Sequence, residues 1–508
     1  MNGPWLVMCD VDGVQTWLLR SVHLREIAGA SQLLVDHDDE MPKVAVGGQA
    51  LFSGGGSALV RFDHRAQAER LQRELPSSLQ RRTVDATVTV SEPQGVGTGP
   101  FGDAVARAVR DVEQKKRLGR LHGETADACF ALRCQGCASE PVVAEGQVRI
   151  NNEPRLLGAG CLARHKARSR AGWLDWMRIR PGWQGIGPAH LPADATELSG
   201  GGKLALVLAD VNGVGERLAS LQTEESYKVF SEGLTRAVHK ALVEAVADVV
   251  TPREDDGWKL AVEVLYAGGD DVLLACRDDL ALRLVRKLVT EFGSRASGDS
   301  NHWCGGVPLG ISAAVAVVGP KFPFRAAHAI AGRLLRHAKR VARQERWTEG
   351  AVDWAVVTEA WAEGGPILSD RSIESSSLAL ELTGRPYRAS AAGLRSLGSF
   401  QEACSKLATE FPRNKLFDLR GLCSASQLAP RASGAATRRA VDEARQDLSA
   451  RVLDLVGRLQ RNPDAARRWT EAISALGLDP QKPFWNVEAE WRTPVGDLAE
   501  GIGLWGLS

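Results

Sequence analysis

Two separate stretches of the chain carry carboxylates in a form suited to binding divalent cations. Asp210 ends an apolar run, while Asp270 and Asp271 follow two glycines in the sequence Ala-Gly-Gly-Asp-Asp. Mg²⁺ or Mn²⁺ binds carboxylate oxygens and substrate phosphates, and two such ions stabilise the attacking and leaving oxygens of an in-line phosphoryl transfer. Gly268 and Gly269 would let the backbone approach a triphosphate without a side-chain clash. These residues indicate a phosphoryl-transfer site, provided that a hairpin places Asp270 and Asp271 beside the strand that ends at Asp210.

The alternative is that Gly-Gly-Asp-Asp forms only a polar turn, because Gly and Asp are both preferred turn residues. An internal repeat argues against this alternative. Residues 5–14 match residues 205–214, and residues 51–60 match residues 265–274 in the same order. The second match reads in both copies as an apolar strand, a Gly-Gly turn and another apolar strand, which predicts a β-hairpin.

Each copy also contains helix-like stretches and a further strand. Amphipathic helices are expected at 64–75 and 278–292, and strands at 84–91 and 308–318. This order of elements predicts two α+β domains, each an antiparallel sheet with helices on one face. We expect the two copies to pack face to face, with a groove between them.

The first copy differs where the chemistry would take place. It keeps Asp10 and Asp12, but it has Gly56 and Ser57 where the second copy has its two adjacent carboxylates. We therefore expect the first copy to hold no catalytic metal pair.

These residues resemble the large, palm-domain subunit of type III CRISPR effector complexes, which is related to the GGDEF cyclases and to polymerase palms. The similarity spans about residues 5–430, and its most specific element is the GGDD hairpin with Ala-Asp-Val-Asn-Gly-Val upstream. The other similar stretches are residues 24–31, 53–56, 309–314, 321–324, 338–339 and 382–387.

The resemblance implies an α+β protein with two ferredoxin-like palm domains, a zinc-finger-like insertion and a C-terminal helical domain. It also implies that the second palm joins ATP molecules into cyclic oligoadenylates and that the degenerate first palm holds the acceptor nucleotide. Asp210, Asp270 and Asp271 would then be the catalytic metal ligands. The residues expected to contact the nucleotide are Gly213, Gly268, Gly269 and Lys339. A solvated position on a basic helix face, 325–346, is the alternative for Lys339.

A possible zinc site lies between the two copies. Cys134 and Cys137 form a C-x2-C pair, and Cys161 and His165 form a distant C-x3-H pair. Ligands at these spacings can close around one tetrahedral zinc that stabilises a small domain with little core. The family usually completes this site with a second C-x2-C, so His165 is inferred and Cys129 is the competing fourth ligand. Unliganded cysteines in a decayed finger are the alternative.

A stretch after the cysteines interleaves basic and aromatic residues, a composition suited to phosphate contacts and base stacking. The alternative is a helical surface with buried tryptophans. The residues are Arg164, Lys166, Arg168, Arg170, Arg178, Arg180, Trp173, Trp176 and Trp183.

Many members of the resembling family begin with a metal-dependent HD nuclease domain, whereas this sequence enters its first palm strand by residue 5. The dipeptide His37-Asp38 is a possible substitute. We expect it to lie in an exposed polar loop without the further histidines that a dinuclear site needs. Cleavage of single-stranded DNA is therefore not predicted.

The composition is typical of a folded protein of several domains. The chain has 508 residues, of which 44% are apolar and 25% charged, with a net charge of +1 that indicates no class of partner. No apolar run approaches the ~20 residues needed to cross a bilayer. Nine scattered cysteines do not form a secreted disulfide framework. We expect a cytoplasmic protein with no membrane contact.

The repeat and its flanking sequences suggest four domains. We expect a first palm at 1–118, a zinc-binding insertion at 119–198, a second palm at 199–365 and a helical domain at 366–508. The boundaries follow from the Ser199-Gly-Gly-Gly run, from Gly364-Gly-Pro, and from helical periodicity after residue 388.

Three functions remain possible at this point. The first is an ATP-consuming cyclic oligonucleotide synthase within an RNA-guided antiviral complex, with guide and target RNA and other effector subunits as partners. The second is a stand-alone antiviral nucleotidyl cyclase that makes a cyclic dinucleotide or larger ring. The third is a catalytically idle scaffold that binds RNA, against which the intact Asp210, Asp270 and Asp271 argue.

Overall fold

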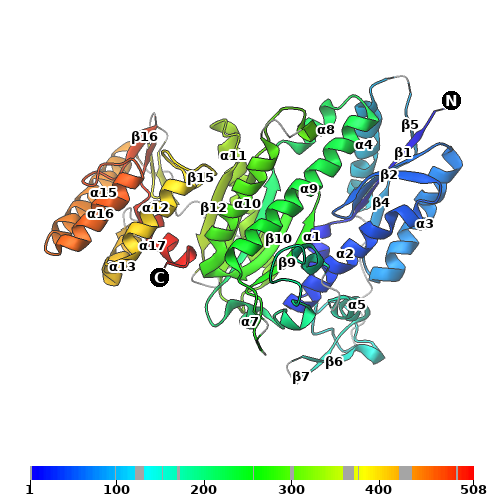
Figure 1. Ribbon diagram of the computed structural model, residues 1–508, viewed down its shortest axis with the longest axis horizontal. Coiled ribbons are helices and arrows are strands. Elements are labelled where there is room, and N and C mark those ends of the chain that lie inside the picture. Colours follow the sequence, from blue (N-terminus) through cyan, green and yellow to red (C-terminus); the bar gives the residue numbers. More distant parts are fainter. Residues whose placement is uncertain are drawn as a thin grey trace.

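The structure is a computed structural model of an elongated molecule, with the N-terminus at one end and the C-terminus nearer the middle (Figure 1). It describes residues 3–97, 99–119, 131–150, 153–168, 172–253, 255, 257–297, 302–357, 371–375, 377–422, 437–487 and 490–507. The first palm lies beside the second, and the C-terminal segment lies beyond the second palm at the opposite end (Figure 1). The domain boundary expected near residue 365 falls outside the described residues.

The first palm is a sheet in the order β2-β3-β1-β4, with β5 also paired to β1. The prediction of helices on one face was wrong, because helices cover both faces of this sheet. Alternating residues of β1, Val7, Cys9 and Val11, lie in one core with α2 and α3, whereas Leu6 lies in a second core with α4. The elements are β1 (Trp5–Val11), α1 (Val14–Leu18), α2 (Leu24–Val44), β2 (Gly48–Gly54), β3 (Ser57–Phe62), α3 (Arg65–Thr83), β4 (Val88–Val90), β5 (Gln94–Gly95) and α4 (Phe101–Gly119).

The second palm repeats this order as β9-β10-β8-β11 and extends it with β12 and β15. Strands β8 and β11 read as almost continuous apolar runs because helices cover both of their faces. The elements are β8 (Leu204–Val211), α8 (Val214–Ser220), α9 (Glu224–Val249), β9 (Val262–Gly268), β10 (Asp271–Arg277), α10 (Ala281–Ala296), β11 (Ile311–Val318), α11 (Phe324–Gln344) and β12 (Ala351–Val356). The shared strand order confirms the predicted α+β fold with two ferredoxin-like palms.

The segment between the palms is small and lies below them in Figure 1. Its hairpin and first helix, α5, surround the cysteines, and α5 packs closely on α2: a Cβ at Gly29 would fall 1.8 Å from the backbone oxygen of Arg164. The elements are β6 (Gln147–Ile150), β7 (Glu153–Leu156), α5 (Ala159–Ala167), α6 (Trp173–Met177) and α7 (Ala195–Ser199).

The C-terminal segment contains the expected helices and also a small sheet that was not anticipated. The sheet has the order β13-β14-β17-β16, and β15 joins the sheet of the second palm instead. The elements are β13 (Ser372–Glu374), β14 (Ala379–Glu381), β15 (Tyr387–Arg388), α12 (Leu397–Ala408), α13 (Arg413–Leu422), α15 (Arg438–Leu459), α16 (Pro463–Ala475), β16 (Trp485–Val487), β17 (Glu490–Arg492) and α17 (Val495–Leu504).

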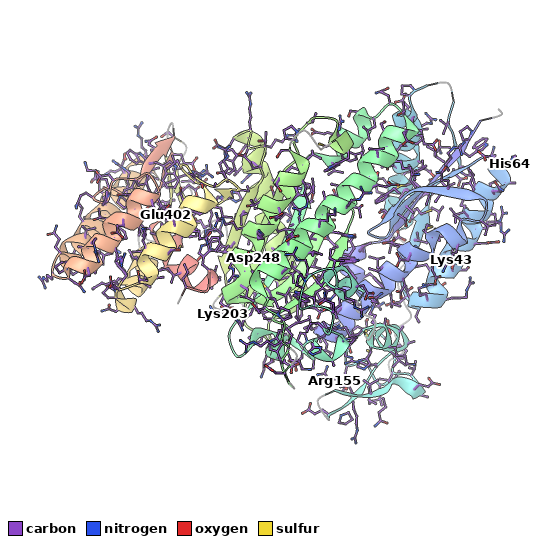
Figure 2. The ribbon with its side chains drawn as sticks, in the orientation of Figure 1. Lys43, His64, Arg155, Lys203, Asp248 and Glu402 are labelled. Carbon is purple, nitrogen blue, oxygen red and sulfur yellow. The ribbon has the colours of Figure 1, made fainter. Side chains whose placement is uncertain are left out.

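The helices expose their polar faces, as amphipathic packing requires. Lys43 on α2, Asp248 on α9 and Glu402 on α12 are exposed and project from the surface in Figure 2. None of the helices in the described ranges is long and apolar enough to cross a membrane.

The prediction that His37 and Asp38 lie in an exposed loop was wrong. Both residues belong to α2, and His37 is 4% exposed. The helix continues through this acidic stretch because Ile27, Leu34 and Met41 repeat every seven residues and are all buried.

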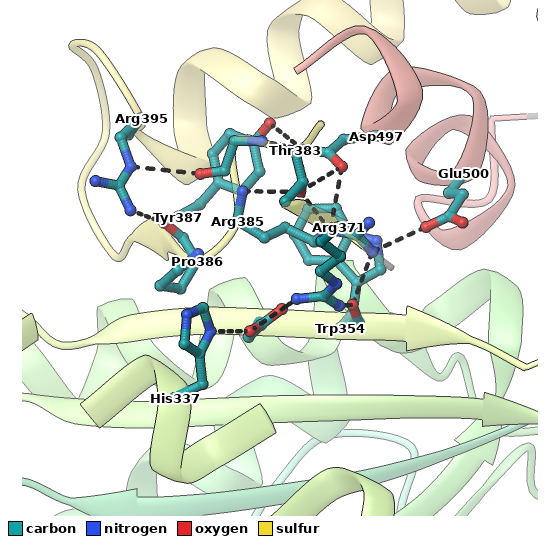
Figure 3. A network of polar contacts seen from close by, with 12 residues as sticks. His337, Trp354, Arg371, Thr383, Arg385, Pro386, Tyr387, Arg395, Asp497 and Glu500 are labelled. Atoms are coloured by element: carbon teal, nitrogen blue, oxygen red, sulfur yellow. Dashed lines mark hydrogen bonds and ion pairs between the residues drawn. The ribbon is translucent and has the colours of Figure 1, made fainter. Parts of the chain in front are cut away.

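A buried polar network joins the second palm to the C-terminal segment (Figure 3). Asp353 on β12 is fully buried and accepts hydrogen bonds from Arg371 at 2.8 and 3.1 Å. The Nδ1 atom of His337 on α11 lies 2.7 Å from the same carboxylate. Close by, Arg385 pairs with Asp497 of α17 at 3.1 Å. The network therefore fixes α11 and β12 against the chain that follows them.

We predict that Asp353→Asn destabilises the protein by about 3 to 5 kcal/mol at neutral pH, because Arg371 would remain buried without its counter-charge. Arg371 and His337 lower the pKa of Asp353 to about 2 despite its burial. The usual pKa of Asp is about 3.9, so the stabilisation is complete above that value and is lost as the pH falls toward 2. Denaturant unfolding at several pH values should show the wild type and the variant converging in acid.

An exposed ion pair provides the matched control. Arg439 and Glu443 on α15 are 88% and 61% exposed, so Glu443→Gln should cost less than about 1 kcal/mol at every pH. An Asp353→Asn cost as small as that of the control would contradict the role assigned to the network.

Candidate functional site

The predicted carboxylate cluster forms at the edge of the second-palm sheet. Strand β10 pairs antiparallel with β8, and Asp271 lies directly opposite Asp210. Asp270 occupies the turn, where its backbone oxygen accepts a hydrogen bond of 3.2 Å from the Val211 N–H. The hairpin therefore lies beside the strand that ends at Asp210, as the sequence predicts.

The carboxylates of Asp210, Asp270 and Asp271 repel one another. Burial and, after it, repulsion from Asp210 raise the pKa of Asp270 to about 6 and that of Asp271 to about 7. Lys339 lowers the pKa of both groups, but it does not offset these two causes. Carboxylates crowded in this way favour a cation among them.

Lys339 supplies one cation to this site. Its Nζ forms an ion pair with Asp210 and donates a hydrogen bond of 3.2 Å to the Val211 carbonyl oxygen. The oxygens of the three carboxylates do not all lie within 4.8 Å of one another, a closeness that only the cysteine cluster reaches among the residues that the structure describes. The three carboxylates and the Val211 carbonyl nevertheless offer the oxygen ligands that Mg²⁺ prefers.

The first palm repeats the arrangement without the extra carboxylates. Lys116 on α4 lies 2.6 Å from an Asp10 carboxylate oxygen and donates to the Val11 carbonyl at 2.9 Å. Ser57 is opposite Asp10 in the sheet, where Asp271 is opposite Asp210, and its hydroxyl donates to Asp10 at 2.7 Å. Lys116 was missed by the sequence analysis, although it has the same place on α4 that Lys339 has on α11.

The two Gly-Gly turns lie against each other. A Cβ added to Gly268 would fall 2.6 Å from the backbone of Gly55, and one added to Gly55 would fall 2.3 Å from the Tyr266 hydroxyl. Asp38 of α2 supports the first-palm turn, because both of its carboxylate oxygens lie 3.2 Å from the Gly56 N–H. The palms therefore face each other through their turns, as expected from the repeat.

Two cavities border these turns. One, of about 660 Å³, lies between α11 and the end of α1 and includes Asp210 and Lys339. The other, of about 790 Å³, lies between α4 and α8 and includes Asp10 and Lys116. Asp271 lines both cavities.

The glycines predicted to contact the nucleotide differ in their positions. Gly268 and Gly269 line the larger cavity. Gly213 begins α8 with φ +73°, in the left-handed region that favours glycine, and does not line either cavity. Its neighbours Val214 and Gly215 line the larger cavity.

The structure gathers three of the four predicted zinc ligands. The sulfurs of Cys134, Cys137 and Cys161 lie within 4.8 Å of one another. His165 is not part of this cluster: its Nδ1 lies 3.0 Å from a carboxylate oxygen of Glu26, because α5 packs on α2. The competing ligand, Cys129, lies outside the described residues.

The basic and aromatic stretch is a packing surface, so the alternative of buried tryptophans holds for the residues that the structure describes. Trp173 and Trp183 are buried. Arg168 is 5% exposed and pairs with Glu263 of β9 at 2.5 Å. Arg164 is fully buried and pairs with Asp85 of the first palm at 2.7 Å. These cations are neutralised within the protein, and Arg170 lies outside the described residues.

We predict that Gly268→Ala lowers the free energy of unfolding by about 1 to 3 kcal/mol, because the new methyl group would overlap the Gly55 backbone and force the turns apart. Gly293→Ala is the control: nothing lies within 4 Å of a Cβ at this position in α10, so it should be neutral or slightly stabilising. Denaturant unfolding of both variants tests the contact, and equal stabilities would refute it.

Comparisons with known proteins agree with this geometry. Residues 203–348 match the family model described as Cas10/Cmr2, second palm domain. No curated protein matches the chain.

Solved structures with a similar fold include a Csm1-Csm4 cassette in complex with cA4, at 14% identity and TM-score 0.51. They also include the cassette in complex with AMPPNP, at 16% identity and TM-score 0.51, and a Csm1-Csm4 subcomplex in the type III-A CRISPR-Csm interference complex, at 15% and 0.51. Each covers 100% of this chain and 70% of the matched chain. The segment that matches this family model carries Asp210, the GGDD hairpin and Lys339.

Proposed function

We propose that the protein is a nucleotidyltransferase that converts ATP into cyclic oligoadenylate in type III CRISPR antiviral defence. The observation that carries the proposal is the pairing of Asp210 with Asp271, next to Asp270, where the two cavities meet. A site at this junction can hold a triphosphate on one side and an attacking 3′-hydroxyl on the other.

The residues of the chain would divide the work of the reaction. Asp210, Asp270 and Asp271 would hold Mg²⁺ or Mn²⁺, which when bound activates the 3′-hydroxyl and stabilises the leaving pyrophosphate. Lys339, released from Asp210, would neutralise phosphate charge. The Gly268 and Gly269 turn would keep side chains out of the space between the reacting groups.

The identity of the nucleotide rests on the similar structures. The printed descriptions name Csm1-Csm4 cassettes in complex with AMPPNP and with cA4. We propose by analogy that this chain uses ATP and works with a Csm4-like subunit in an RNA-guided complex. The stand-alone cyclase remains the second candidate, and RNA or subunits that copurify with the chain would favour the complex.

We predict that Asp270→Ala/Asp271→Ala abolishes ATP consumption and leaves folding intact. Removing two crowded carboxylates relieves repulsion, so the thermal midpoint should not fall. The measurement is incubation with Mg²⁺ and each NTP, followed by mass spectrometry of the products. The control, Asp442→Ala/Glu443→Ala, removes two adjacent carboxylates on α15 and should retain full activity. Full synthesis by the GGDD variant would place the active centre elsewhere.

The cysteine cluster is proposed to bind a structural zinc ion. The Cys134 and Cys137 sulfurs accept hydrogen bonds of 3.3 Å from the Gly136 N–H and the Ser139 hydroxyl. Gly136 lies so close beneath the cluster that a Cβ there would fall 2.9 Å from the Cys161 sulfur. Hydrogen bonds among the three thiols lower the pKa of Cys137 and raise that of Cys161, so the cluster holds one thiolate most easily, and a bound cation would favour the others.

We predict about one zinc per chain in protein purified without added metal, and its loss in Cys134→Ser. His165→Ala should keep the zinc, because this ring contacts Glu26 and not the sulfurs. Elemental analysis of the three proteins is the test. Zinc that depends on His165, or that persists without Cys134, would contradict the assignment.

A further inference from the structure

The two cavities are related by the internal repeat down to single residues of their walls. The face of α4 in one cavity and the face of α11 in the other match position by position at an offset of 223 residues. In the first cavity the α4 residues are Gly102, Val105, Ala106, Val109, Arg110, Glu113 and Lys116. Their α11 counterparts in the second cavity are Arg325, His328, Ala329, Gly332, Arg333, Arg336 and Lys339.

The opposite walls follow the same relation. The α11 cavity is closed by Gln15 and Leu18 from the first palm, and the α4 cavity by Gly215 and Leu218 from the second palm, at an offset of 200. Each cavity is therefore built from a long helix of one palm and the short helix of the other. The two cavities can be compared as two versions of one site.

The charges of the two versions differ. Both keep one arginine and the lysine, but Arg325 and Arg336 in the α11 cavity correspond to Gly102 and Glu113 in the α4 cavity. The α11 cavity thus has four cationic side chains and two carboxylates, while the α4 cavity has two cationic side chains and four carboxylates.

The arginines of the α11 cavity are not used to hold the protein together. Among the described residues, no carboxylate forms an ion pair with Arg325, Arg333 or Arg336, and the buried Nε of Arg333 has no hydrogen-bond partner. Burial and Arg336 lower the pKa of His328 to about 4, so this ring adds no charge near neutral pH. Arg333, Arg336 and Lys339 are spaced about one helical turn apart and cover about 9 Å, a length suited to an extended triphosphate.

The α4 cavity has the opposite excess of charge, with more carboxylates than cationic side chains. Its helix carries Glu113, and its outer wall is apolar, with Phe230 and Leu234 from α9. Asp270 and Asp271 border it at the junction with the other cavity. These walls suit a base and ribose, and they repel a second polyphosphate.

We propose that Arg333 and Arg336 make the α11 cavity the high-affinity triphosphate site, and that Glu113 makes the α4 cavity select an acceptor nucleotide whose triphosphate is not held. This inference rests on the proposed function. It adds that a triphosphate binds more tightly in the α11 cavity than in the α4 cavity. The 3′-oxygen of the nucleotide in the α4 cavity bonds to the α-phosphorus of the triphosphate in the α11 cavity. The bond from that phosphorus to pyrophosphate breaks, and the hydroxyl proton passes to solvent.

The asymmetry has a consequence for product length. In the first step the acceptor is itself a triphosphate, which Glu113 disfavours. In later steps the acceptor is the 3′ end of an oligonucleotide, whose last phosphate is a diester with a single charge. Elongation and closure are therefore favoured over the formation of new dinucleotides.

Binding of AMPPNP with Mg²⁺ to the full chain, measured by calorimetry, tests the charge assignment without turnover. We expect one strong and one weak site in the wild type. Arg336→Glu should weaken the strong site about ten- to hundredfold, because charge-assisted hydrogen bonds to phosphate are lost. Glu113→Arg should strengthen the weak site by a similar factor. Arg340→Glu reverses a charge on α11 outside both cavities and should change neither site.

Adenosine and product analysis complete the test. Adenosine, which lacks phosphate, should bind Arg336→Glu as it binds the wild type, and Glu113→Arg should release more linear dinucleotide relative to longer products. Unchanged AMPPNP affinity in Arg336→Glu, or an equal loss in Arg340→Glu, would overturn the inference even if ATP is still consumed. If the affinities shift as expected but no ATP is consumed, the proposed function fails and the charge assignment of the cavities stands.

Discussion

The contact between the two Gly-Gly turns determines the rest of the site. Gly55 and Gly268 meet backbone to backbone, and the Tyr266 hydroxyl fills the space that a side chain on Gly55 would need. With the turns in contact, the Asp-bearing strand end of each palm faces the short helix of the other palm, which is α1 for Asp210 and α8 for Asp10. The cavities then lie on either side of the turns, and Asp271 borders both. A larger residue at Gly268 would overlap the Gly55 backbone and separate the two halves of the site.

One lysine–aspartate pair recurs in both palms and shows what changed between them. Lys116 with Asp10 and Lys339 with Asp210 have the same contacts, including the carbonyl that follows each aspartate. In the first palm the group opposite Asp10 is the hydroxyl of Ser57, and Lys116 also lies 3.5 Å from a carboxylate oxygen of Asp12. In the second palm two further carboxylates leave negative charge that one lysine does not offset. The turn therefore gives the second palm two adjacent carboxylates at the positions where the first palm has Gly56 and Ser57.

The sequence predicted the features that both copies of the internal repeat share. The strand order and the meeting of Asp210 with Asp271 follow from matched apolar runs around Gly-Gly turns, which are local patterns. Lys116 was missed because α4 and α11 share only a lysine, one arginine and a few small residues at matching positions, so matching that ended at the hairpin could not find it. The three-residue strands of the C-terminal sheet are too short for any periodicity to reveal.

Two features of the segment between the palms depend on contacts that are distant in the sequence. His165 follows Cys161 by one helical turn, but the partner of its ring is Glu26, 139 residues away. Arg164 and Arg168 have the composition of a phosphate-binding surface, yet Asp85 and Glu263 neutralise them. Nothing in a local motif shows whether a cation has a partner elsewhere in the fold, and only the packing of α5 on α2 and on the second palm decides it.

Helix α11 links the cavity that it lines to the C-terminal segment. His337, two residues before Lys339, faces the buried Asp353, so the helix is held by the C-terminal network on one side and by Asp210 on the other. Arg333 and Arg336 lie within two helical turns of these contacts, at a rise of about 1.5 Å per residue. The positions of Arg333 and Arg336 are then set by the same network that seats β12 and the C-terminal segment. The charge that the cavity offers a nucleotide is thus tied, through one helix, to the packing of the domain that follows it.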